Sequence, residues 1–234
     1  MSCSEHQNIL LELRAMKDLW ELLVNCMDKV SLLKIKYTSY ISALKETGVP
    51  QETCKKYEDE YYQEDLVGMG VLVNNFQLKD FPFIRNSINK ILAHGNAIGL
   101  NLDMEGLHLS SPGVHEPSNK KAPFTIRKKL KQDYEDQLNA YAELMDFLVD
   151  QRDLFLDIRG FYADTCKQME EKGVPVQVAS SYHVNCCVSN IRQFNIIIDH
   201  LERDYAFLKE PFLVILQSLQ EIKPYFNIKY PKSM

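Results

Sequence analysis

Apolar residues recur at alternating steps of three and four along most of the chain. The first such ladder contains Ile9, Leu13, Met16, Trp20, Leu23, Met27, Val30, Tyr37, Ile41 and Leu44. The steps average 3.5 residues, the a/d spacing of a coiled coil, so one apolar stripe stays turned towards a neighbouring helix. Gly48 suits a left-handed helix end, and Pro50 cannot continue the helix. The pattern predicts a long helix over residues 5–47.

Two further helices are expected before residue 100. Residues 51–78 favour a helix, although a strand within residues 66–76 is the competing interpretation because Gly68 and Gly70 weaken the helix. A lone strand without a pairing partner is a poor alternative. Asp80 is placed to cap a short helix over residues 82–97, with Pro82 in its first turn.

The second half of the chain repeats the helical periodicity as a long hairpin over residues 124–222. Its second helix carries a continuous apolar seam. Pro211 interrupts the backbone hydrogen bonding of that helix but leaves the seam in phase, so we expect a kink rather than a new element. The seam residues that we predict to contact a partner are Cys187, Ile191, Phe194, Ile198, Leu201, Tyr205, Leu208, Phe212, Ile215 and Leu219.

The predicted elements fall into two helical domains. Residues 1–99 form an N-terminal unit, and the hairpin over residues 124–222 forms a C-terminal unit. Residues 100–123 are rich in Gly, Pro and Ser and predict a flexible linker, while residues 223–234 predict an extended tail. The fold class expected is all-α, with elongated antiparallel hairpins in a coiled-coil-like bundle.

One short motif occurs twice. Residues 48–50 and 173–175 both read Gly-Val-Pro, and each ends a long predicted helix. Because Gly-x-Pro is a common helix stop signal, this motif by itself does not establish an internal duplication.

Composition narrows the classes of partner. The formal net charge is −5, so there is no general basic excess to attract nucleic acid. No apolar stretch is long enough to predict a transmembrane segment, and residues 1–7 lack a signal-peptide core. The six cysteines have irregular spacing without a C-x-x-C pair, so we expect reduced thiols and a cytoplasmic protein, with the nucleus as an alternative.

Candidate chemistry is sparse. His183, Cys186 and Cys187 lie close together on one predicted helix, but zinc would need further ligands, and a packed thiol accounts for Cys187. The sequence shows no catalytic motif, so we expect no catalytic residues, cofactor or metal. The only basic cluster lies at the start of the first helix of the predicted hairpin over residues 124–222. It is a weaker candidate for binding an acidic partner surface and comprises Arg127, Lys128, Lys129 and Lys131.

These features predict a non-catalytic scaffold subunit of a larger intracellular complex of coiled-coil helices. Cytoskeletal and cell-division complexes contain subunits of this architecture. The expected partners are other helical subunits, in a hetero-oligomer rather than a homo-oligomer. The alternative is a self-contained helical-bundle adaptor, or a homodimeric membrane-associated trafficking or tethering module.

Overall fold

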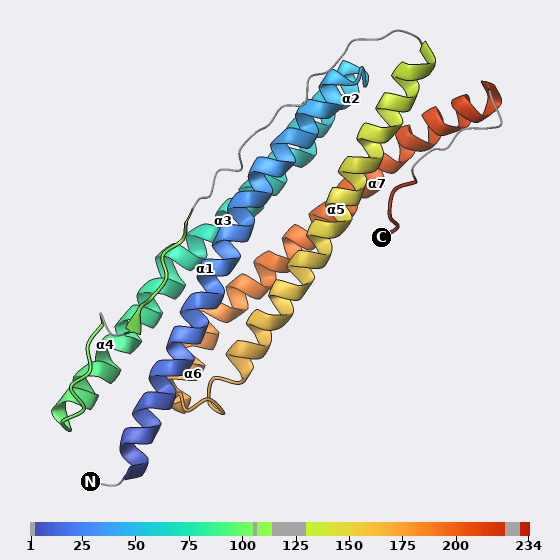
Figure 1. Ribbon diagram of the computed structural model, residues 1–234. Helices are drawn as coiled ribbons and strands as arrows, with labels where there is room; N and C mark the ends of the chain where they lie inside the picture. Colours follow the sequence, from blue (N-terminus) through green and yellow to red (C-terminus); the bar gives the residue numbers. More distant parts are fainter. Residues whose placement is uncertain (1–2, 105–106, 114–129, 223–229) are drawn as a thin grey trace. The chain divides into compact units, whose positions relative to one another are not determined.

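The chain folds as an all-α helical bundle, which confirms the predicted fold class. The computed structural model describes residues 3–104, 107–113, 130–222 and 230–234. Figure 1 shows helices and connecting segments over these ranges, and none of the described residues forms a strand.

The first two long helices form a hairpin. Helix α1 spans Cys3–Glu46, and a short turn leads to a second continuous helix. That second helix comprises α2 (Gln51–Tyr57), η1 (Glu58–Tyr62), α3 (Gln63–Asn75), η2 (Phe76–Asp80) and α4 (Phe81–Ala97). Segments η1 and η2 are single π-helical stretches, in which the backbone accommodates an extra residue. Residues 66–76 are helical, as the favoured interpretation of the sequence predicted.

The other two long helices form a second hairpin. Helix α5 spans Leu130–Lys167, and a turn leads to a continuous helix made of α6 (Val176–Tyr182), η4 (His183–Cys187) and α7 (Val188–Ile222). Helix α7 continues through Pro211, as the uninterrupted apolar ladder predicted.

Asp80 does not cap a separate short helix, so this part of the sequence-based prediction is wrong. Its backbone is helical, it makes no side-chain capping bond, and α4 follows η2 without a break. The π-helical stretch η2 leads directly into α4, and the helix continues through Pro82 although proline cannot donate a backbone hydrogen bond. The Asp80 carboxylate is buried and serves a different purpose.

Backbone contacts divide the chain into two compact units. Unit 1 comprises Met1–Val30, Met69–Val114 and Leu156–Asn195, and unit 2 comprises Ser31–Gly68, His115–Phe155 and Ile196–Met234. This grouping differs from the predicted division into residues 1–99 and 124–222, because each predicted half supplies segments to both units.

The two hairpins correspond to each other at a constant sequence offset. The Gly-Val-Pro turns, α2 and α6, and η1 and η4 all lie 125 positions apart. Gly48 and Gly173 both adopt positive φ, at 82° and 94°, a conformation that favours glycine. The chain is therefore built from two repeats of one helical hairpin, and the Gly-Val-Pro motif marks the same turn in both.

Part of the predicted linker lies against unit 1. The Trp20 indole N–H donates to the Ser110 carbonyl (2.8 Å), and the Ser110 and Gly113 amides donate to Glu21 and Asp28. Residues 114–123 lie outside the described ranges. Of the predicted tail, residues 230–234 have no regular secondary structure, and the Lys232 amide donates to Asp146 of α5.

Because each unit takes segments from both repeats, neither half of the chain contains a complete unit. We expect residues 1–113 and residues 114–234, expressed separately, to be poorly structured or to self-associate. Mixing them should restore helicity and a cooperative thermal transition, measured by circular dichroism. A cooperative monomeric transition for either isolated half would contradict this expectation.

Candidate functional site

A fully buried polar cluster lies in the core of unit 2. Cluster II consists of Tyr37 (α1), Tyr57 (α2), Asp65 (α3) and Asp204 (α7), all without solvent exposure. The Tyr37 hydroxyl lies 2.6 Å from that of Tyr57, 2.8 Å from Asp65 Oδ2 and 3.0 Å from Asp204 Oδ2. The Tyr57 hydroxyl donates to Asp204 Oδ2 at 3.3 Å. The cluster therefore joins three helices of unit 2 through side chains alone.

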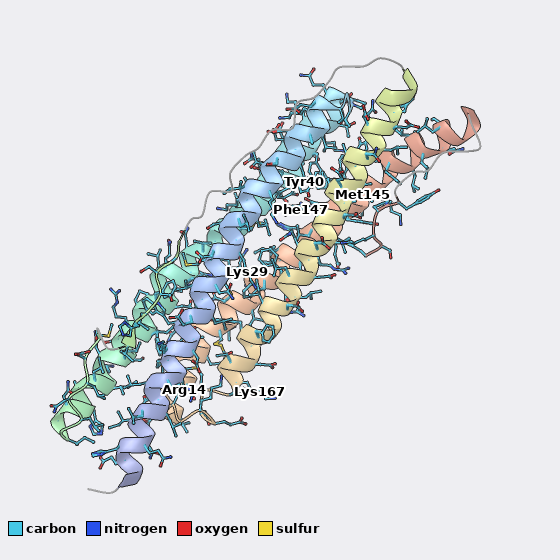
Figure 2. The ribbon with its side chains drawn as sticks, viewed as in Figure 1. Arg14, Lys29, Tyr40, Met145, Phe147 and Lys167 are labelled. Carbon is cyan, nitrogen blue, oxygen red and sulfur yellow. A yellow bond between two sulfur atoms is a disulfide. The ribbon has the colours of Figure 1, made fainter. Side chains whose placement is uncertain are left out.

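Aromatic rings surround cluster II. The Tyr37 ring packs edge-on against Tyr62 and lies 5.4 Å from the ring of Phe147 of α5. Figure 2 labels Phe147 and Tyr40, whose ring centroids are 4.8 Å apart between α5 and α1. These rings exclude water from the carboxyl groups, and water exclusion strengthens each hydrogen bond in the cluster.

A second cluster of the same design lies in the core of unit 1. Cluster I consists of Asp80 (η2), Tyr162 (α5), Tyr182 (α6) and Asn190 (α7), all buried. The Tyr162 and Tyr182 hydroxyls donate to Asp80 Oδ1 at 2.9 Å and 2.6 Å. Asn190 Nδ2 donates to Asp80 Oδ2 and to the Tyr162 hydroxyl, both at 2.9 Å.

The two clusters match residue by residue. Tyr162, Tyr182 and Asn190 each lie 125 positions after a member of cluster II, namely Tyr37, Tyr57 and Asp65. The fourth members, Asp80 and Asp204, lie 124 positions apart because η2 adds one residue to the first repeat and the corresponding part of α7 is α-helical. The π-helical stretch thus brings Asp80 to the position that Asp204 occupies in unit 2.

The one chemical difference between the clusters is Asp65 in place of Asn190. In each residue one terminal atom contacts the tyrosine hydroxyl, and the side chain is hydrogen-bonded to the partner carboxyl group, while the buried Oδ1 has no hydrogen-bond partner among the described residues. The contacting atom is the Nδ2 donor in Asn190 and Oδ2 in Asp65. An oxygen can take over the role of the amide donor only if it carries a proton.

Burial and charge both favour that proton. Burial, followed by the negative charge of Asp204, raises the pKa of Asp65 to about 9. Burial also raises the pKa of Asp204, but hydrogen bonds from neighbouring groups and the nearby Arg203 guanidinium act in the opposite direction. The pair therefore holds one proton at neutral pH, and Asp65 is the neutral member.

Charged groups from α3 and α7 border cluster II. Arg203 donates to Asp204 Oδ1 at 3.3 Å and to Glu64 at 2.7 Å. His200 Nδ1 lies 3.7 Å from Asp65 Oδ1, and both atoms are buried without a hydrogen bond in the described structure. Arg203 compensates the charge of Asp204, so the ionised member of the pair is the one with a cationic neighbour.

Cluster II has the paired carboxyl groups that acid–base catalysis uses, but its geometry suits another purpose. All four side chains lack exposure, and each hydroxyl or carboxyl group contacts another cluster member. Proton transfer to a substrate requires hydrogen-bonding contact with that substrate. Within the described ranges, no group of three or more His, Cys, Asp or Glu residues is arranged to hold a metal ion.

The predicted partner-binding seam lies mostly in the protein interior. Ile191 and Ile215 are half-buried, and the fully buried members are Cys187, Phe194, Ile198, Leu201, Tyr205, Leu208, Phe212 and Leu219. Their burial shows that the seam supplies core packing within the chain, and its contact with a partner stays a prediction.

The basic cluster is largely outside the described ranges. Residues 127–129 fall there, and Lys131 lies in the first turn of α5.

The cysteines differ from the prediction: Cys166 and Cys187 form a disulfide, so the expectation of six reduced thiols is wrong. The two sulfurs meet because α5 and η4 pack together in unit 1, and the disulfide removes Cys187 from the zinc site considered with His183.

Comparisons of the chain with protein-family models, with curated proteins and with solved structures find no match. Among the helices described, none has an apolar stretch of the length needed to cross a membrane.

The protonated Asp65 predicts a specific pH dependence of stability. Its pKa is raised in the folded state, so the folded protein binds this proton more tightly than the unfolded chain, and the free energy of unfolding falls as pH rises from about 4 towards 9. The substitution Asp65→Asn supplies the donor without a titrating group, as Asn190 does. We expect it to reduce the loss of stability between pH 5 and pH 9 by at least ~1.4 kcal/mol, the equivalent of one pKa unit.

Urea unfolding of both proteins at several pH values measures this difference. Apart from Asp204, which shares a proton with Asp65, the other titrating groups are common to the two proteins and cancel in the comparison. Parallel pH profiles for the wild-type protein and Asp65→Asn would show that Asp65 is ionised in the folded state.

The reverse substitution tests the equivalence of the clusters. Asn190→Asp places a second carboxyl group beside Asp80, which has no arginine hydrogen-bonded to it among the described residues. We expect destabilisation that is about 1–3 kcal/mol larger at pH 8 than at pH 5, because the new carboxyl group must be buried with its proton. Equal destabilisation at both pH values would contradict this account.

Proposed function

We propose that the protein is a non-catalytic scaffold subunit that binds helices of other proteins within a larger helical complex. The two clusters support this role, because each fixes the register of the helices that it joins and leaves their outer surfaces free for partners. The cytoskeletal or cell-division setting expected from the architecture is part of the same proposal.

The observation that carries the proposal is a set of exposed apolar side chains on the second hairpin. In unit 1, Val184 is 70% exposed and Val188 is 55% exposed, one helical turn apart on η4 and α7. Phe161 of α5 and Val176 of α6 are also largely exposed. Isolated apolar residues are common on protein surfaces, but neighbours at helical spacing provide a continuous contact for another helix.

The first hairpin provides an internal reference. The residues 125 positions earlier are Lys36, Gln51, Asp59 and Gln63, all polar. The repeats share their backbone pattern and their buried clusters, so the fold does not require apolar residues at these exposed positions. The second repeat has apolar side chains where the first has polar ones, which favours a role in binding.

The test is the double substitution Val184→Glu and Val188→Glu in the full chain. Both side chains are exposed, so we expect the fold and thermal stability to change little, within about 0.5 kcal/mol each. Association with partner subunits purified from the native complex should fall at least tenfold, measured by size-exclusion chromatography with light scattering. Buried seam residues such as Phe194 are unsuitable for this test, because a charge there unfolds the protein.

The matched control is Asp59→Lys with Gln63→Lys, which changes charge at the equivalent positions of the first repeat. We expect this variant to keep its partners. A native complex that survives the glutamate substitutions unchanged would argue against the proposal.

A further inference from the structure

A groove between α2 and α7 is lined chiefly by apolar side chains of unit 2. It has a volume of about 440 Å³, within the range of protein ligand sites. We call it the apolar groove; its lining includes Pro50, Tyr141, Phe207, Pro211, Val214 and Ile215. Val214 is 61% exposed, and its neighbour Leu213 is 48% exposed, so apolar surface continues beyond the groove along α7.

Unit 1 has a groove at the equivalent place, between α6 and α4, with different chemistry. From η2 onward the two repeats are offset by 124 positions, so Ser87 and Lys90 correspond to Pro211 and Val214. Gln177 and Ser181 of α6 also line this second groove, which we call the polar groove. Phe207 and Ile215 have the apolar equivalents Phe83 and Ile91, so the grooves differ chiefly at Pro211 and Val214, where the repeat does not require apolar side chains.

Two hydrogen-bonding groups at the apolar groove lack their usual partners. The Tyr141 hydroxyl is buried and has no hydrogen-bond partner in the described structure. Pro211 has no N–H, so the carbonyl of Phe207, four residues earlier in α7, loses its normal helical donor. A buried hydroxyl without a partner, such as that of Tyr141, is rare in native proteins because it costs free energy. A bound side chain with both a ring and a donor group would satisfy them.

The charges at the rim indicate the sign of the partner. Glu52 and Glu210 line the groove, and neither makes an ion pair within the described ranges. Lys56 is the one cation of the lining described, and its ammonium lies over the Phe207 ring, 5.4 Å from the centroid. The uncompensated rim charge is therefore negative and complements Lys or Arg.

We propose that the apolar groove binds an amphipathic helix of a partner protein, which inserts a Trp or Tyr side chain flanked by Lys or Arg. The apolar body of the ring packs against Pro211 and Ile215, and its N–H or O–H reaches the Phe207 carbonyl or the Tyr141 hydroxyl. The open groove and the exposed Leu213 and Val214 suit an extended helix. This inference rests on the proposed function and names a second partner-binding surface for it.

The experiment uses the full chain and fluorescein-labelled synthetic helices of about 18 residues, roughly five turns. One peptide carries a central Trp with flanking Lys residues, one replaces Trp with Ala, and one replaces Lys with Glu. Fluorescence anisotropy measures binding to the wild-type protein and to Val214→Glu, Lys90→Glu and Tyr141→Phe. We expect the Trp–Lys peptide to bind at least tenfold more tightly than the other two.

The variants separate the groove from general effects. Val214→Glu should weaken binding at least tenfold, whereas Lys90→Glu at the equivalent site of the polar groove should not. Tyr141→Phe removes the unpartnered hydroxyl, so it should weaken binding about fivefold without lowering the thermal stability of the free protein. Equal binding of the three peptides, or binding that Val214→Glu leaves unchanged, overturns the proposal.

The outcome is independent of the test of the proposed function. Val184→Glu with Val188→Glu should leave peptide binding at the apolar groove unchanged. Loss of the native complex in that variant, combined with failure of the peptide test, would reject the groove and retain the scaffold function. Peptide binding at the groove as expected, combined with a native complex that survives the Val184→Glu and Val188→Glu substitutions, would retain the groove and reject the scaffold function.

Discussion

Burying a carboxylate costs several kcal/mol unless hydrogen bonds or a compensating charge replace its hydration. Both units of this protein contain such a group in their cores, and both meet the cost with two tyrosine hydroxyls. The third contact is an amide N–H from Asn190 in unit 1 and a shared carboxyl proton from Asp65 in unit 2. The donors come from different helices, so the carboxylate is satisfied only when those helices reach one register. Apolar packing alone tolerates small sliding of one helix against another, whereas this geometry does not.

The repeated architecture allows conserved and altered features to be compared within one molecule. Equivalent positions keep the tyrosines, the Gly-Val-Pro turns and the π-helical stretches after α2 and α6. Equivalent exposed positions differ, as Lys90 and Val214 illustrate. Stability restricts the positions that are the same in both repeats, whereas the exposed positions that differ are free to change with binding. A polar residue in one repeat and an apolar residue in the other thus identifies surface that folding does not require.

Apolar spacing was sufficient to predict the long helices and their turns. Ile41 lies in the core where the three–four spacing places it, and Val49 lies in the turn that the Gly-x-Pro stop signal predicts. Helix α7 passes through Pro211, as the unchanged phase of its apolar spacing predicted. Spacing could not identify the buried acids. Asp65 and Asp204 resemble surface residues in sequence, and the donors that make their burial tolerable lie far away along the chain.

Two other features also depended on information that a ladder does not contain. The seam around Phe194 and Leu201 has the same periodicity whether its neighbour belongs to the same chain or to another, so periodicity could not assign the partner. Asp80 lies two residues before Pro82, a pattern typical of a helix start, and no pattern of residues indicated that η2 would continue the helix. The spacing of 125 residues between the paired tyrosines was the one available signal for the clusters, and only the structure shows that both pairs bind carboxylates.

The exchange of segments between repeats has a consequence for biosynthesis. Unit 1 needs residues up to Asn195, and unit 2 needs α7 as well, so neither core can close while the first repeat alone has left the ribosome. The apolar face of α1, Asp80 of η2 and Asp65 of α3 all contact residues of the second repeat, which is translated later, so they stay unpacked until then. During that interval the nascent chain exposes surface that the folded protein buries, and each core can close only after its segments of the second repeat have been translated.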